Sequence, residues 1–123
     1  MRKLAFHGIL AQLLSSTPGS IAAIFLDWEG ETVALLTAAD VEQDELKALG
    51  AYQGIFLKQL RTLCSNLDIG EPQRFKVEFA KRKVLSCDVK DGYFVVMLVG
   101  AETNEGEAWH HLVHCRQDLL QEM

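Results

Sequence analysis

The chain of 123 residues lacks the features that mark membrane, disulfide-bonded or nucleic-acid-binding proteins. Its three cysteines form no CxxC pair, which argues against a zinc knuckle, a redox motif or a disulfide framework. Its longest apolar runs, IAAIFL and YFVVMLV, are far shorter than the roughly 20 residues that cross a bilayer. Its 12 basic side chains are outnumbered by 17 acidic ones, so the net charge is negative, which is the wrong sign for binding phosphate backbones. We therefore expect a cytoplasmic protein with no nucleic-acid partner and no membrane insertion.

Sequence signatures of catalysis and nucleotide binding are also missing. The chain contains no GxSxG, no GxxxxGK[ST], no GxGxxG and no HExxH. No nucleophile and base, and no closed set of metal ligands, can be assembled from the pattern. We expect no catalytic residue, no cofactor and no required metal, and hence a protein that is not an enzyme.

The histidines near the C-terminus are the best candidates for metal ligands. His110 and His114 are four residues apart, a spacing at which a helix can offer two ligands to one metal. On a helical wheel they point away from the apolar stripe, and no acidic or cysteine ligand is placed to complete a tetrahedral site. We interpret them as part of a solvated helix face and leave open whether that face binds a metal.

The apolar periodicity predicts eight elements in the order αββαβββα within one domain, residues 1–123. Capping-box spacings, Asp40 with Gln43 and Asn104 with Glu107, mark two of the helix starts. The expected helices span 3–15, 41–66 and 105–121, and the expected strands span 20–27, 31–37, 74–80, 84–89 and 93–99. The first and last strands are apolar on both faces and belong in the middle of a sheet, whereas segment 74–80 alternates and belongs at an edge. The predicted class is α+β.

The long helix, 41–66, has two unusual features beside its apolar stripe. Gly50 and Gly54 lie in its interior, where glycine is unfavourable, which indicates a close approach by another backbone. Small residues and one isoleucine form a second strip. The expected core stripe is Leu46, Leu49, Tyr52, Phe56, Leu57, Leu60, Leu63, Cys64 and Leu67, and the second strip is Ala48, Ala51 and Ile55.

The sequence resembles the Roadblock/dynein light chain family in its order of elements and in three segments. These are the opening helix followed by Pro18-Gly19, the hairpin from Ile21 to Gly30, and the strand that begins Asp91-Gly92-Tyr93. The likeness covers roughly residues 4–120. It implies a five-stranded antiparallel sheet in the order 2-1-5-4-3, with one long helix on one face and two helices on the other. It also implies a dimeric, non-enzymatic platform for small Ras-like GTPases or dynein, like the bacterial gliding-polarity member that activates GTP hydrolysis.

The resemblance and the residues together predict a homodimer. The edge segment from Arg74 to Ala80 is a template for antiparallel pairing, with a two-fold axis at Val77 that places Lys76 opposite Glu78 of the second chain. The strip of Ala48, Ala51 and Ile55 would pack alongside. The predicted dimer interface is Ala48, Ala51, Ile55, Arg74, Lys76, Val77 and Glu78.

The expected GTPase partner would dock on the polar side of the long helix, at Lys47, Lys58, Arg61 and Thr62. The alternative function is a small-molecule sensing or regulatory domain of related profilin-like or longin-like architecture, with a ligand between sheet and helix. Arg116, in the apolar stripe of the last helix, is interpreted as laying its methylenes on the core and lifting its guanidinium to water.

Overall fold

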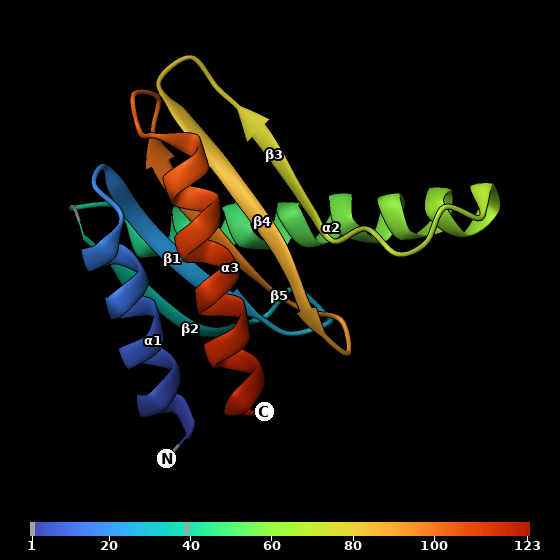
Figure 1. Cartoon of the computed structure of the whole chain (residues 1–123), viewed down its shortest axis with the longest axis horizontal. Helices are drawn as coiled ribbons and strands as arrows, with labels where there is room; N and C mark the ends of the chain where they lie inside the picture. Colours follow the sequence, from blue (N-terminus) through green and yellow to red (C-terminus); the bar gives the residue numbers. More distant parts are fainter. Residues whose placement is uncertain (1, 39) are drawn as a thin grey trace.

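The computed structural model describes residues 2–38 and 40–123, with side chains from Leu4 onward in the first helix. Its elements follow the predicted order αββαβββα (Figure 1). They are α1 (Arg2–Ser16), β1 (Ser20–Leu26), β2 (Thr32–Thr37), α2 (Gln43–Leu67), β3 (Arg74–Glu78), β4 (Arg82–Lys90), β5 (Tyr93–Gly100) and α3 (Glu105–Gln121).

The five strands form one antiparallel sheet in the order β2-β1-β5-β4-β3. The apolar strands β1 and β5 are neighbours in its middle, with Phe25 opposite Val95. The alternating strand β3 lies at the edge and pairs with β4, Val77 opposite Val84. The predicted α+β class and strand order are therefore confirmed.

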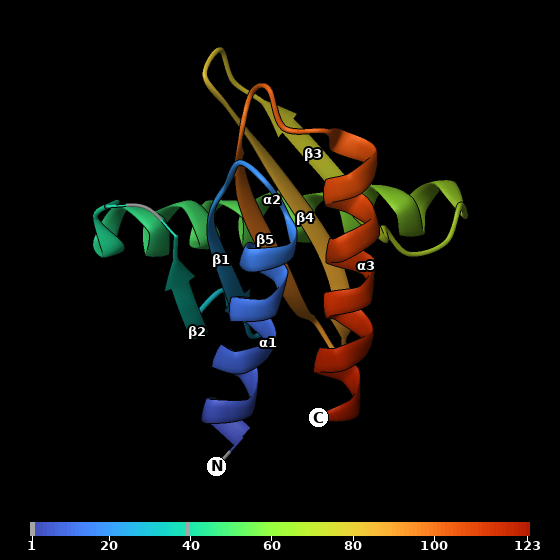
Figure 2. The same cartoon turned by 60° about the vertical axis from the view of Figure 1, so that its left-hand side comes forward.

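Helices cover both faces of the sheet. Figures 1 and 2 show α1 and α3 side by side on one face, while α2 crosses the other. Each face has its own apolar core, because alternate residues of β1, β4 and β5 point to opposite sides. The core under α1 and α3 includes Leu10, Phe25, Leu85, Met97, Leu112 and Leu119; the core under α2 includes Ile24, Leu26, Leu46, Leu57, Phe94 and Val96.

The sequence predicts the start of one of the two capped helices correctly. Asn104 Oδ1 accepts a hydrogen bond from the N–H of Glu107 at 2.9 Å, so α3 begins as expected. The cap of α2 is instead Glu42, whose carboxylate accepts from the N–H of Asp44 at 3.1 Å. The predicted capping box of Asp40 and Gln43 is wrong, because the backbone of Glu42 is still extended and Gln43 is the first helical residue.

The two interior glycines of α2 lie where the helix meets the sheet, as their spacing indicates. A Cβ atom on Gly50 would lie 2.7 Å from Cδ2 of Leu26, and one on Gly54 would lie 3.2 Å from Cζ of Phe94. The same Cβ position on Gly54 is 3.5 Å from the Cα of Gly30, in the turn between β1 and β2. A larger residue at Gly50 would therefore require the Leu26 side chain or the helix to shift.

Helix α2 extends past the β3 edge of the sheet, and its last turns cover no strand (Figure 1). It ends at Leu67, and the capping residue Asp68, whose backbone is left-handed, donates its N–H to the carbonyl of Ser65. No helix within residues 2–38 and 40–123 is long and apolar enough to cross a membrane.

Candidate interaction surface

Two hydrogen bonds show which way the backbone of β3 faces. The N–H of Phe79 donates to the carbonyl of Arg82, and the N–H of Asp88 donates to the carbonyl of Gln73, both at 2.8 Å. Hydrogen-bonded pairs recur at every second residue of an antiparallel ladder. The odd-numbered residues of β3 therefore direct their backbone groups toward β4.

The even-numbered residues of β3 direct their backbone groups the other way. These are Arg74, Lys76 and Glu78, and β3 is the last strand in the described sheet order. Their N–H and C=O groups face outward along the open edge. Such a row can pair with a strand of another chain.

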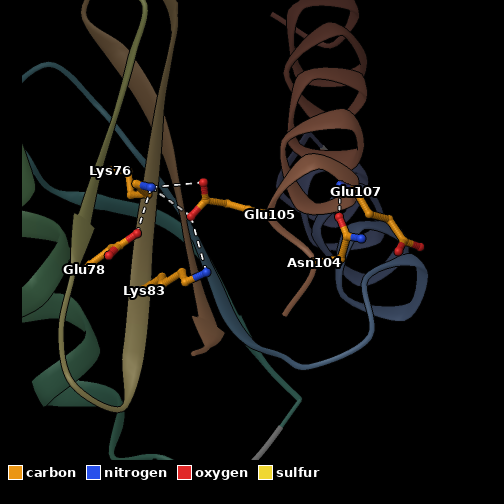
Figure 3. Close-up of polar contacts among 6 residues, drawn as sticks. All are labelled: Lys76, Glu78, Lys83, Asn104, Glu105 and Glu107. Atoms are coloured by element: carbon orange, nitrogen blue, oxygen red, sulfur yellow. Dashed lines mark hydrogen bonds and ion pairs between the residues drawn. The ribbon is translucent and has the colours of Figure 1, made fainter. Parts of the chain in front are cut away.

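Side chains of β3 that face α3 form an ion network (Figure 3). Lys76 Nζ lies 2.8 Å from Glu78 Oε1 and 3.0 Å from both carboxylate oxygens of Glu105, and Lys83 Nζ lies 3.4 Å from Glu105 Oε1. Hydrogen bonds to Glu78 and then to Glu105 raise the pKa of Lys76, and the bond from Lys76 lowers the pKa of the Glu105 carboxyl. Lys76, predicted to face Glu78 of a second chain, thus already contacts Glu78 of its own chain.

Arg74, at the start of β3, has a different contact. Its guanidinium lies over the indole of Trp109 in α3, 5.2 Å from the ring centroid, within the range of a cation–π interaction. Val77 is half-buried and points to the α2 side of the sheet with Phe75. Four of the predicted interface residues, Arg74, Lys76, Val77 and Glu78, therefore lie on one edge strand.

The strip of Ala48, Ala51 and Ile55 lies on the outer side of α2. All three residues are exposed, and Ile55 keeps 51% of its surface accessible. The structure brings them onto the same helix face but not next to β3 within one chain. Whether they pack against a second chain stays a prediction.

The predicted core stripe of α2 is wrong for four of its members. Tyr52, Phe56, Leu63 and Leu67 are exposed, whereas Gln53 is buried and accepts a hydrogen bond from Ser86 Oγ at 3.1 Å. The helix contacts the sheet through its two glycines, so the buried side of α2 is the one that carries Gly50, Gln53 and Gly54. The exposed four recur at spacings of four, seven and four residues, so they lie on one side of α2. We call Tyr52, Phe56, Leu63 and Leu67 the apolar flank.

The four predicted partner-binding residues of α2 divide into two kinds. Lys47, Lys58 and Thr62 are exposed, and the Thr62 hydroxyl donates to the carbonyl of Lys58 at 3.2 Å. Arg61 is half-buried, and its Nη2 lies 3.0 Å from Asp88 Oδ1 in β4. Arg61 therefore anchors α2 to the sheet, and the other three remain on the exposed surface of the helix.

The histidines of α3 lie on its polar side, away from the apolar stripe as the wheel predicts, and border a hollow between α3 and α1. His110 and His114 are exposed, with ring centroids 4.7 Å apart, and His111 Nε2 lies 3.8 Å from Glu107 Oε1. Among the residues that the structure describes, no three histidine, cysteine, aspartate or glutamate side chains are grouped to hold a metal ion. Burial raises the pKa of the Cys115 thiol to about 12 and keeps it protonated.

The guanidinium of Arg116 contacts the sheet and does not simply extend into solvent. Its Nε donates to the carbonyl of Asp88 at 2.7 Å, and its Nη2 donates to the carbonyl of Val89 at 3.2 Å. These carbonyls lie where the pairing of β4 with β5 shifts register. Arg116 is therefore held from α3 at the end of β4, a contact that the sequence pattern does not reveal.

Comparison with solved structures shows which known fold this arrangement matches. The Roadblock/LC7 domain from Streptomyces avermitilis superposes with a TM-score of 0.83 at 14% identity, covering 92% of each chain. The gliding protein MglB from Thermus thermophilus gives 0.88 at 15% identity, covering 98% of this chain and 90% of that one. An MglB with a tetrameric arrangement gives 0.89 at 15% identity, covering 98% and 89%.

Comparison with protein-family models and with curated proteins finds no match. The structural likeness, at these low identities, shows that the chain has the fold of the Roadblock/LC7 domain.

Proposed function

We propose that this chain, over residues 1–123, is a Roadblock-like homodimer that regulates or scaffolds a small Ras-like GTPase and is not itself an enzyme. The observation that carries the proposal is the Roadblock fold with an open edge strand beside an exposed apolar helix. The fold is shared with MglB, a gliding protein, one structure of which has a tetrameric arrangement. The proposal includes stimulation of GTP hydrolysis by the bound GTPase.

The dimer would form by pairing two β3 strands about a two-fold axis at Val77. Lys76 of each chain then lies opposite Glu78 of the other, and both residues have the outward backbone groups that such a hydrogen-bonded pair requires. Phe75 would lie opposite Phe79, which is exposed in the single chain. The register therefore satisfies the free backbone groups and covers an exposed aromatic ring.

The long helix supports the same arrangement. Its last turns extend past β3, so in a continuous two-chain sheet they would lie over the strands of the second chain (Figure 1). Leu63 and Leu67, with exposed fractions of 52% and 58%, would then contact apolar side chains instead of water. Burial of apolar surface contributes about 25 cal/mol per Å², so covering Leu63 and Leu67 would add to the dimer affinity.

The GTPase would dock on the outer side of α2, around Lys47, Lys58 and Thr62. These side chains are exposed, and in a two-fold dimer the two long helices would present them on one continuous face. Arg61 borders this face but is held by Asp88. Activation would not require an arginine supplied by this chain, because a regulator can also act by repositioning the GTPase's own residues.

The test uses a small Ras-like GTPase encoded by a neighbouring gene. We expect saturable binding of its GTP-bound form and a faster single-turnover hydrolysis of GTP when the chain is added. Lys58→Glu should weaken binding at least fivefold, whereas Lys90→Glu, the same charge change outside α2, should leave it unchanged. Arg61 is left unchanged, because its replacement by glutamate would place a carboxylate against Asp88.

Two outcomes would contradict parts of the proposal. If the GTPase binds but its hydrolysis is no faster, the chain is a scaffold and the proposed stimulation of GTP hydrolysis is wrong. Full-strength binding by the Lys58→Glu protein, with an unchanged melting temperature, would place the docking surface away from α2.

A further inference from the structure

A hollow of about 440 Å³ opens between the start of β3, the end of β4 and α3. Arg74 and Arg116 lie on its walls, with Val113 and the buried Cys87 between them. The volume is in the range of sites that hold small organic molecules. It lies on the α3 side of the sheet, apart from the α2 surface proposed for the GTPase.

Arg116 is positioned in this hollow with unused hydrogen-bond donors. A guanidinium has five N–H donors, and two of these groups bond the carbonyls of Asp88 and Val89. The other three N–H donors have no acceptor among the described residues. The Arg116 nitrogens are not among the buried atoms that lack a partner, so these donors are accessible to solvent. The two bonds to β4 therefore hold the guanidinium in place while its other edge faces open space.

Arg74 faces the same hollow from β3. Its guanidinium rests on the Trp109 indole and has no hydrogen bond or ion pair with any described side chain. A second hollow of about 370 Å³ shares Arg74 and Val113 and continues along α3 past Trp109. The two hollows thus join the arginines to a surface that Val113 and Trp109 share with the polar side chains of His110, His114 and Gln117.

In the described part of the chain, neither of the two carboxylates that line the hollow forms an ion pair with these arginines. The side chain of Asp88 is bonded to Arg61 on the α2 side. Glu71 also lines the hollow, but it forms no ion pair in the described part of the chain. Burial raises the pKa of the Cys87 thiol; the charge of Arg116 opposes that rise, the charge of Asp88 adds to it, and the charge of Arg74 opposes it.

We propose that this hollow binds a small organic anion, a carboxylate or phosphate ester attached to an apolar or aromatic body. Arg116 and Arg74 would bind the anionic group with paired N–H donors, the geometry in which guanidinium recognises these oxyanions best. Val113 and Trp109 would contact the body of the ligand. Such a site would add to the chain the ligand-sensing role that the sequence leaves as an alternative.

The experiment titrates the full chain with three fluorinated probes and follows each by ¹⁹F NMR. 4-Fluorobenzoate presents a carboxylate, 4-fluorophenyl phosphate presents a phosphate ester, and 4-fluorobenzamide has the same ring without charge. We expect saturable binding of at least one anionic probe with a Kd of about 1 mM or tighter, and at least tenfold weaker binding of the amide. The better anionic probe identifies the preferred group.

Variants then locate the probe. Arg74→Gln should raise the Kd about tenfold, as should Arg116→Lys, which keeps the charge but loses the planar fork. Lys58→Gln removes one charge on the other side of the sheet and should leave the Kd unchanged. Light scattering and circular dichroism of each variant separate an altered site from an altered oligomer or fold.

Three results would overturn the proposal. The first is the absence of saturable binding by either anionic probe, and the second is equal affinity for the amide. The third is an unchanged Kd in both folded arginine variants.

Discussion

Lys76 Nζ lies 3.0 Å from each carboxylate oxygen of Glu105, so the edge strand β3 is tied to the first turn of α3 (Figure 3). The two residues are 29 positions apart in the chain. Lys83 reaches the same carboxylate from β4, which makes Glu105 the shared acceptor of two lysines. These contacts therefore link the open edge to α3 within a single chain.

This ion network should stabilise the fold only between two pH limits. Glu105 has a lowered pKa in the folded chain, so its contribution is present above its ordinary value of 4.5 and is lost as pH falls through the lowered pKa. Lys76 has a raised pKa, so its contribution is present below 10.5 and is lost as pH rises through the raised pKa. A double-mutant cycle of Lys76→Gln and Glu105→Gln, measured by urea unfolding, should show coupling at neutral pH and none at either extreme. Equal coupling in acid would mean that the two side chains do not interact through charge.

Adding one methyl group to two glycines should change stability in opposite directions. Gly50→Ala places a Cβ atom 2.7 Å from the fully buried Leu26 side chain, and overpacking of this kind costs about 1–3 kcal/mol, which exceeds the gain of about 0.5–1 kcal/mol from a better helix former. Gly8→Ala in α1 meets nothing within 4 Å and keeps the full gain. Chemical denaturation should therefore give a less stable Gly50→Ala and a more stable Gly8→Ala protein. A Gly50→Ala protein as stable as Gly8→Ala would show that α2 does not pack this closely.

Proline substitutions in β3 should separate dimer formation from folding. The N–H of Glu78 faces the open edge, so Glu78→Pro should leave the pairing with β4 intact and block pairing with a second chain. The N–H of Val77 faces β4, so Val77→Pro should also lower the melting temperature of the single chain. Light scattering should find Glu78→Pro monomeric at a concentration where the parent chain is dimeric. A Glu78→Pro protein that stays dimeric would place the interface elsewhere.

Much of the fold follows from local patterns that can be read in the sequence. The alternation of β3 predicts an edge strand, and the two-sided apolar character of β1 and β5 predicts the middle of the sheet. Asn104 predicts the start of α3, because its cap bonds an N–H only three residues away. Such signals depend on neighbouring residues, so no knowledge of the tertiary structure is needed to interpret them.

The buried face of α2 could not be predicted in the same way. A helical wheel centres the core on the largest apolar side chains, but Tyr52 and Phe56 are exposed and Gly50 and Gly54 are buried. The wheel cannot show that α2 reaches past the sheet or that glycines set the closest approach. Sequence therefore identifies the helix and its amphipathic character, but not which side the sheet covers.

The sequence by itself determined the order and type of the elements, the edge position of β3 and the cap of α3, because each depends on hydrogen bonds and side-chain periodicity over a few residues. The tertiary structure alone decided which side chains meet across the chain: Arg61 with Asp88, Lys76 with Glu105, and Arg74 with Arg116 around one hollow. These pairs are separated by 27 or more positions and come together only when helices pack on a twisted sheet. Long-range contacts of this kind depend on the relative placement of whole elements, for which no local pattern gives a signal.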